Sequence, residues 1–258
     1  MGYETIMVWD VGWVRTITLN RPERRNAMTP QMQLELIAAM EEAAASDCRV
    51  VVLAGAGESF CSGLDLSALH GAKEKTSEEH REDAMRIARL FRMLYELPKA
   101  TIAAVHGAAV AGGTGLATIC DFTLAVPGAK FGYTEVRIGF VPAVVSAYLV
   151  LQIGEKRARD LLLTGRLFDA AEAYRVGLVS EVVAAEELGA RVRALAEVVG
   201  ANSPESVRAT KRLLAAQNKD WLDAAIELAM EANANARETA DFYEGVTAFL
   251  EKRKPVWS

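Results

Sequence analysis

The 258-residue sequence predicts an α/β fold in which buried strands, glycine-containing loops and helices alternate before a helical region completes the chain. Two uninterrupted apolar runs, residues 49–55 and 99–107, have the pattern of strands buried on both faces. Each run is followed by a loop that contains glycine. From about residue 142, the remaining segments have helix-like patterns separated by Gly, Pro or Asn.

The first predicted element is a hairpin over residues 4–20, where two β-rich runs flank Asp10-Val11-Gly12 and Gly12 can adopt the positive φ of a turn. A charged loop follows. Thr29 and Pro30 then begin a helix, with Thr29 as its N-cap. The stripe expected to be buried on this helix consists of Met32, Leu34, Leu36, Ile37 and Met40.

The middle of the chain repeats the order of strand, loop and helix. The strand at 49–55 leads into a loop over 56–72 and a helix over 77–97, which Pro98 ends. The strand at 99–107 leads into a glycine-rich segment, a helix that starts with residues 116–120, and a strand over 121–126. The later helix-like segments are too many to cover one core, so they also predict an oligomerisation layer.

Composition and residue spacing exclude several kinds of binding partner and site. The formal net charge of −5 disfavours nucleic-acid binding. The sequence contains no window of about 20 uncharged apolar residues, so we expect no membrane span. No signal peptide is visible, so we expect a cytoplasmic location. We predict no metal site, since neither the cysteines nor the histidines have ligand spacing, and we expect the cysteines to pack in the core. These residues are Cys48, Cys61, Cys120, His70, His80 and His106.

The glycines in "AAVHGAAVAGGTGLATICD" (103–121) admit three interpretations. A phosphate site is disfavoured, because the spacing fits neither the dinucleotide fingerprint nor a Walker A loop. Close packing of a helix on a strand is a structural alternative. The third interpretation is an oxyanion hole, in which an N–H at the start of a helix pairs with a second donor from "FCSGLDL" (60–66).

Six ordered blocks together give the sequence a clear resemblance to the crotonase superfamily, the enoyl-CoA hydratase/isomerase family. They are "ITLNRPERRNAM" (17–28), residues 60–66, residues 103–121, "FGYTEVRIGFVP" (131–142), "LLLTGRLFDAAEAYRVGLVSEVV" (161–183) and "AFLEKRKP" (248–255). The resemblance implies a spiral of ββα repeats, here over 1–195, and a C-terminal helical oligomerisation region over 196–258. It also implies a homotrimer, or a hexamer built as a dimer of trimers.

The resemblance further implies roles for individual residues. The backbone N–H groups of Leu64 and Gly112 match the donors to the thioester oxygen of an acyl-CoA substrate. Glu135 matches the catalytic glutamate, although pairing with Arg137 would be favoured if the motif stood alone. The positions that match a CoA-binding surface are Arg24, Ala27, Ser62, Leu66, Phe249 and Lys252. No cofactor is implied, because coenzyme A is part of the substrate.

Gly115 departs from the pattern of the best-known hydratases, which carry a second glutamate there. The retained Glu135 is enough to move a double bond, which favours a 3,2-enoyl-CoA isomerase. The segment from residue 134 nevertheless resembles a branch of enoyl-CoA or methylglutaconyl-CoA-type hydratases that also has Gly at this position. Ala143 stands where dienoyl-CoA isomerases carry Asp. Enoyl-CoA hydratase is therefore the main prediction, the isomerase the alternative, and a non-catalytic CoA-binding or scaffold protein a second alternative.

The acyl pocket is expected to involve residues 66–95. Leu66, Leu69, Met85 and Leu94 could face an acyl chain or belong to the ordinary core, and the core interpretation is favoured.

Overall fold

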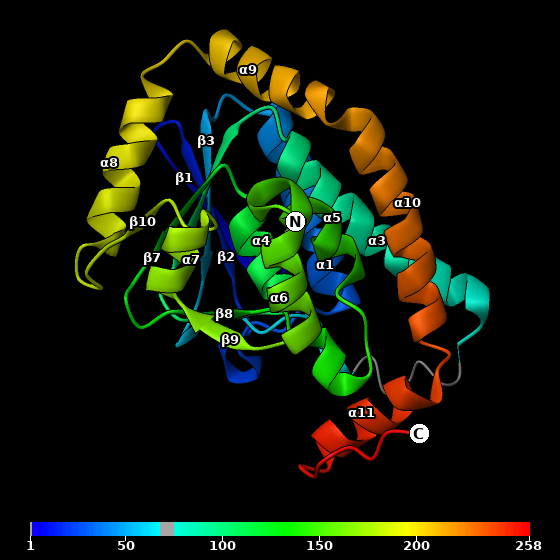
Figure 1. Cartoon of the computed structure of the whole chain (residues 1–258). Helices are drawn as coiled ribbons and strands as arrows, with labels where there is room; N and C mark the ends of the chain where they lie inside the picture. The colour runs from blue at the N-terminus through cyan, green and yellow to red at the C-terminus, as the bar shows by residue number, and fades with distance from the viewer. Residues whose placement is uncertain (1, 68–74) are drawn as a thin grey trace.

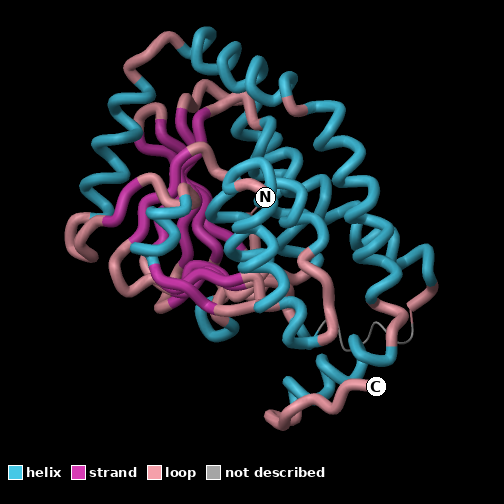
Figure 2. The backbone as a smooth tube through the Cα atoms, in the orientation of Figure 1, coloured by secondary structure: helices cyan, strands magenta, loops and turns pink. Residues whose placement is uncertain are grey.

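The computed structural model describes residues 2–67 and 75–258. Its strands form two sheets, and Figure 2 shows them gathered in one part of the molecule with helices around them. The larger sheet contains, in spatial order, β1 (Ile6–Val11), β2 (Val14–Leu19), β3 (Val50–Gly55), β5 (Ala100–Val105), β7 (Phe122–Ala125) and β10 (Glu181–Val182). The smaller sheet contains β4 (Ser59–Cys61), β6 (Ala108–Val110), β8 (Lys130–Gly132) and β9 (Leu167–Asp169).

The chain winds as a spiral because consecutive strands alternate between the two sheets. β3, β5 and β7 pair in parallel in the larger sheet, while β4, β6 and β8 pair in parallel in the smaller one. Each turn therefore adds one strand to each sheet before the next helix begins. The antiparallel pairs, β1 with β2 and β8 with β9, lie where the spiral starts and ends. The expected spiral of ββα units is confirmed.

Helices cover both sides of the larger sheet (Figure 1). They are α1 (Pro30–Ala45), α3 (Ser77–Glu96), α4 (Gly112–Ile119), α5 (Ala143–Ile153), α6 (Glu155–Thr164), α7 (Ala170–Val176), α8 (Leu188–Gly200), α9 (Pro204–Gln217), α10 (Lys219–Ala236) and α11 (Ala240–Leu250). Short 3₁₀ turns, η1 (Pro22–Arg24) and η3 (Glu135–Ile138), complete the elements used below. Among the described residues, no helix combines the length and apolarity that crossing a membrane requires.

The C-terminal helices turn back toward the core. α8 packs against β3, β5 and β7, whereas α10 runs along α3 and α5, and α11 lies beyond the end of α10 (Figure 1). Leu222, Ile226 and Ala229 of α10 belong to the main apolar core. The predicted domain boundary between residues 195 and 196 falls inside α8 and stays a prediction.

Capping residues set the helix starts that were predicted from the sequence. The Thr29 hydroxyl accepts a hydrogen bond from the N–H of Met32 at 3.2 Å, at the start of α1. Thr76 and Glu79 form a capping box at the start of α3. The hairpin is also confirmed, with Gly12 at φ +59° in its turn. The three cysteines are buried and free, as expected.

Several local predictions were wrong. Leu34 is 54% exposed, so it does not belong to the buried stripe of α1. The loop predicted over 56–72 contains β4, and its residues 68–72 lie outside the described part. α4 begins at Gly112 rather than at Leu116, so the glycines form its first turn. The region after residue 142 is not all helical, because β9 and β10 each complete a sheet there.

Candidate active site

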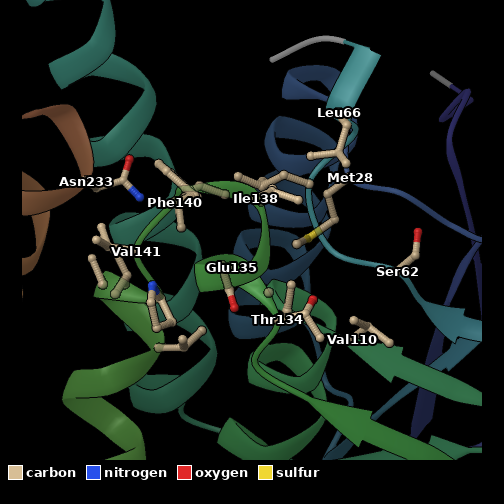
Figure 3. A pocket seen from close by; sticks show the side chains of 18 of the residues that line it. Met28, Ser62, Leu66, Val110, Thr134, Glu135, Ile138, Phe140, Val141 and Asn233 are labelled. Carbon is tan, nitrogen blue, oxygen red and sulfur yellow. The ribbon is translucent and has the colours of Figure 1, made fainter. Parts of the chain in front are cut away.

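A cavity of about 240 Å³ opens between the loop after β4, the start of α4, η3 and α5. Residues from α3, α10 and α11 complete its wall. Most of the lining side chains are apolar, and Glu135 is the one acidic residue among the described residues that line it. Figure 3 shows Glu135 in the middle of this wall, with Asn233 on one side of it and Ser62 on the other.

Glu135 lies at the start of η3, which follows β8 after Tyr133 and Thr134. Gly139 ends the turn in the left-handed conformation, at φ +65°, and the N–H of Phe140 donates to the Glu135 carbonyl at 3.1 Å. α11 packs closely on this turn: a Cβ at Gly139 would overlap the backbone of Asp241. The turn therefore fixes the backbone from which the carboxylate projects.

The Glu135 carboxyl is buried and poorly partnered. The residue is only 8% exposed, and its Oε2 atom has no hydrogen-bond partner among the described residues. Burial raises the pKa of Glu135 from 4.5 to about 7, although a hydrogen bond from its own backbone N–H acts in the opposite direction. No ion pair with Arg137 is formed within the described part of the chain, which removes the alternative that the motif alone favoured.

The start of α4 lies at the cavity. Gly112 lines the cavity and is the first residue of the helix, so its N–H has no acceptor in a preceding turn. Ala111 precedes it at φ +52° and ψ −127°, a conformation that Ala rarely adopts. The N–H of Ala111 is anchored on the Gly132 carbonyl at 2.7 Å. The helix start is thus tied to β8, which leads into Glu135.

Leu64 lines the same cavity. Met28 donates to the Gly63 carbonyl at 2.7 Å and accepts from the N–H of Asp65 at 3.0 Å. In this parallel pairing, the polar groups of Leu64 point away from Met28. A Cβ at Gly63 would lie 3.4 Å from the Gly112 nitrogen, so the loop and the helix start are in close contact. The geometry fits two converging donors, and their role stays a prediction.

Asn26 holds the two loops of the site together. Its side chain is fully buried and its backbone has φ +55°. Its amide nitrogen donates to the carbonyls of Ala56 and Ser59 at 2.9 and 2.8 Å, and its Oδ1 accepts from the N–H of Arg21 at 2.9 Å. The next contact along the loop, from the N–H of Ser62 to the Arg25 carbonyl at 3.0 Å, positions the segment that presents Leu64.

The space beside Gly115 is filled by apolar side chains. A Cβ at this position would lie 2.6 Å from Cγ1 of Val145 and 3.2 Å from Cζ of Phe91. Val145 is β-branched and sits on α5, so it has little freedom to move aside. A side chain at residue 115 would therefore collide with Val145, and apolar side chains fill this space.

Gly113 supports the packing interpretation of the same stretch. A Cβ there would overlap the carbonyl oxygen of Cys61, which belongs to β4. The glycines of α4 thus have different uses: Gly113 and Gly115 permit close packing, while Gly112 presents an N–H to the cavity.

The residues expected to bind CoA are only partly brought together. Ser62, Leu66 and Phe249 line the cavity. Arg24 and Lys252 are exposed and Ala27 is buried, and none of the three lines it. Their role in CoA binding stays a prediction.

The residues proposed for the acyl pocket also lie in different environments. Leu66 lines the cavity, Leu94 is a core residue and Met85 is exposed, so the core interpretation is right only for Leu94. Leu69 lies outside the described residues.

Sequence reasoning missed several residues of the site. Arg25 and Met28 line the cavity beside the expected positions 24 and 27, and Asn233 of α10 lines its far end. Asn233 could have been found, because it interrupts the buried positions 222, 226, 229 and 236 of an amphipathic helix. No cluster of three or more potential metal ligands occurs among the described residues.

Comparison with known proteins places this site in context. The sequence profile of the enoyl-CoA hydratase/isomerase family matches residues 12–258. A Thermus thermophilus protein, provisionally named an enoyl-CoA hydratase, is 47% identical over 95% of this chain and 97% of its own. The crotonyl-CoA hydratase of Syntrophomonas wolfei is 33% identical over 98% of both chains. The crystal structure of an enoyl-CoA hydratase/isomerase from Xanthobacter autotrophicus Py2 is 32% identical, with TM-score 0.89 over 98% of this chain and 100% of its own.

Proposed function

Because the chain belongs to the enoyl-CoA hydratase/isomerase family, we propose that it is a lyase that adds water to the double bond of a 2-enoyl-CoA thioester. The observation that carries this proposal is a single buried carboxyl, Glu135, in an apolar cavity that is also lined by Gly112 and Leu64, the two proposed N–H donors. A carbonyl oxygen bound between these two donors would gain stabilisation as it becomes negatively charged.

In the proposed reaction, Glu135 handles both proton transfers. Its carboxylate takes a proton from water as the water oxygen bonds to C3 of the substrate. The electrons of the C2=C3 bond move to C2 and the thioester oxygen, forming an enolate that the N–H groups of Leu64 and Gly112 stabilise. Glu135 then donates this proton to C2, and its side chain is again an ionised carboxylate. The product is a 3-hydroxyacyl-CoA.

The raised pKa of Glu135 suits this double role. A group with a pKa of about 7 is substantially ionised at neutral pH, yet it is a stronger base than an ordinary glutamate. Its unpartnered Oε2 is free to contact water or substrate. Removing one oxyanion donor of this kind typically costs about 10²–10³-fold in rate.

A second candidate function, 3,2-enoyl-CoA isomerase, is favoured by the absence of a carboxylate at Gly115. The same Glu135 would take a proton from C2 of a 3-enoyl-CoA and return it to C4, and the same N–H groups would stabilise the intermediate. The wall formed by Val145 and Phe91 holds no second carboxylate that hydration could use.

A direct assay separates the two functions. Purified protein is incubated with 2-enoyl-CoA thioesters of several chain types and, separately, with a 3-enoyl-CoA. Enoyl absorbance is followed together with chromatography of the products. Formation of a 3-hydroxyacyl-CoA supports the hydratase. Conversion of a 3-enoyl-CoA to a 2-enoyl-CoA without a hydroxyacyl product supports the isomerase instead. Absence of both reactions would contradict an enzymatic role.

Several further properties belong to the same proposal. We expect CoA to lie along the Ser62 and Leu66 side of the cavity and to enter as part of the substrate, with no separate cofactor. The exposed apolar residues of the C-terminal helices support a homotrimer or a hexamer. They are Leu213, Leu214, Trp221, Leu228 and Phe249. We place the reaction in the cytoplasm, and we retain a core over 1–195 and an oligomerisation region over 196–258.

A further inference from the structure

The end of the cavity farthest from Ser62 carries a buried amide that the proposed reaction does not use. Asn233 of α10 is 4% exposed and lines the cavity beside Phe140 and Val141. Figure 3 shows Glu135 between this residue and the Ser62 side. An acyl chain whose thioester lies at the Leu64 and Gly112 donors and whose CoA lies toward Ser62 would therefore extend toward Asn233.

The orientation of the Asn233 amide is fixed by its neighbour on the helix. The Nε of Arg237 donates to Oδ1 of Asn233 at 3.1 Å. The amide oxygen is thereby occupied, and Figure 3 shows the nitrogen on the side that faces Phe140 and Val141. No side-chain hydrogen bond within the described part of the chain uses Nδ2 of Asn233. The far end of the cavity thus presents a hydrogen-bond donor.

Behind this donor lies a surplus of positive charge. Arg237 is 2% exposed, and its guanidinium lies over the Phe140 ring, 5.4 Å from the centroid. Within the described part of the chain, its one acidic partner is Asp83, with Nη1 and Oδ2 separated by 3.5 Å. The same Asp83 carboxylate also pairs with Lys75 at 2.6 Å and with Arg86.

Among the residues that the structure describes, the neighbouring acids have other partners. Asp65 is engaged by Arg21 at 2.9 Å, and Glu238 accepts a hydrogen bond from Ser77 at the surface. His80, which is buried nearby, has a lowered pKa because of burial and the charge of Arg237, so it is neutral at neutral pH and adds no charge to the cluster. A buried cation with so little compensation would be stabilised by a bound anion.

We propose that the Asn233 end of the cavity recognises an acyl chain that ends in a carboxylate, so that the preferred substrate class is a 2-enoyl-CoA derived from a dicarboxylic acid. A terminal carboxylate would accept a hydrogen bond from Nδ2 of Asn233 and lie in the field of Arg237, which acts through Asn233 and does not itself line the cavity. This inference rests on the proposed function for the direction in which the acyl chain runs.

Binding of saturated thioesters tests the inference without requiring turnover. Affinities are measured for three pairs of equal carbon number: succinyl-CoA with butanoyl-CoA, glutaryl-CoA with pentanoyl-CoA, and adipyl-CoA with hexanoyl-CoA. At least one dicarboxylic member should bind about tenfold or more tightly than its alkyl partner, since a hydrogen bond to a charged group has about that value. Alkyl members that bind as tightly or more tightly in all three pairs would overturn the inference.

The variant Asn233→Asp gives a matched test within the site. It retains an oxygen that accepts from Arg237, so the helix keeps this contact, but it replaces the donor with a negatively charged acceptor. The ratio of dicarboxylic to alkyl-CoA affinity should fall by about tenfold or more, whatever the change in the alkyl-CoA affinity itself. Asn235→Asp, on an exposed face of the same helix, should change neither value. An unchanged preference in Asn233→Asp would contradict the proposal.

Turnover distinguishes failure of this inference from failure of the proposed function. If the protein prefers dicarboxylic thioesters in binding but hydrates no 2-enoyl-CoA, the specificity stands and the hydratase assignment fails. Turnover is compared at the chain length with the largest binding preference. If the alkyl 2-enoyl-CoA is hydrated there with a kcat/KM equal to or above that of its dicarboxylic partner, the hydratase assignment stands and the specificity fails.

Discussion

The two sides of the cavity are built from different kinds of atoms. On one side, the proposed donors are main-chain N–H groups of Leu64 and Gly112, whose positions depend on how a loop and a helix start are packed. On the other side, the proposed acid/base is one side chain, Glu135, set in an apolar wall. The difference teaches that a substitution can remove the acid/base directly, whereas the donors can be disturbed only through the backbone.

The largest expected effect comes from removing the Glu135 carboxylate while the proposed backbone donors are left unchanged. Glu135→Gln retains the shape of the residue but removes its ability to take and return a proton, so kcat/KM for hydration should fall by about 10²–10⁴-fold. The melting temperature should not fall, because a buried ionisable group is replaced by a neutral one. Enzyme kinetics and thermal unfolding measure the two quantities. Glu186→Gln, at the exposed surface, is the matched control and should change neither.

A smaller effect on kcat/KM is expected from disturbing the backbone that carries Gly112. Gly113→Ala places a methyl group against the carbonyl oxygen of Cys61, and neither backbone can move far. The free energy of unfolding should fall by about 3 kcal/mol, the upper end of the cost of overpacking, and kcat/KM should fall as Gly112 moves with its helix. Chemical denaturation measures the first quantity. Gly128→Ala, with no atom near its added Cβ, serves as control; equal losses in both variants would contradict this packing account.

The smallest expected effect concerns the packing of Gly115 against Val145, between the start of α4 and α5. Gly115→Ala should cost about 1–2 kcal/mol of stability, because its Cβ would meet Cγ1 of Val145. In the double variant Gly115→Ala/Val145→Ala, the loss should be smaller than the sum of the two single losses by at least about 0.5 kcal/mol. Additive losses would mean that Val145 does not fill the space beside Gly115.

Much of the fold could be predicted because its long elements carry strong local patterns. The cap at Thr29, the buried run at 49–55 and the helix over 77–97 each have several agreeing signals. The small sheet could not be found in this way. β4, β6, β8 and β9 are each three residues long, too short for periodicity, and they pair only because the spiral brings them together.

The candidate site divides in the same way. Glu135 and the loops that carry Leu64 and Gly112 were located by resemblance to the family, and the structure places all three around one cavity. The depth of burial of Glu135 and the filling of the space beside Gly115 could not be predicted, since both depend on α5 and α11 packing against distant segments. The contact between Arg237 and Asn233, although local in sequence, acquires its meaning only from the cavity that Asn233 lines.

The pH dependence of kcat/KM tests most directly the claim that one carboxylate performs both proton transfers. In this mechanism, Glu135 must start ionised in hydration and in dehydration alike. Since its pKa is about 7, the ionised fraction grows as the pH rises through 7. kcat/KM should therefore rise along a single limb near pH 7 and reach a plateau in both directions of the reaction. A bell-shaped profile would reveal a second essential acid and contradict the account.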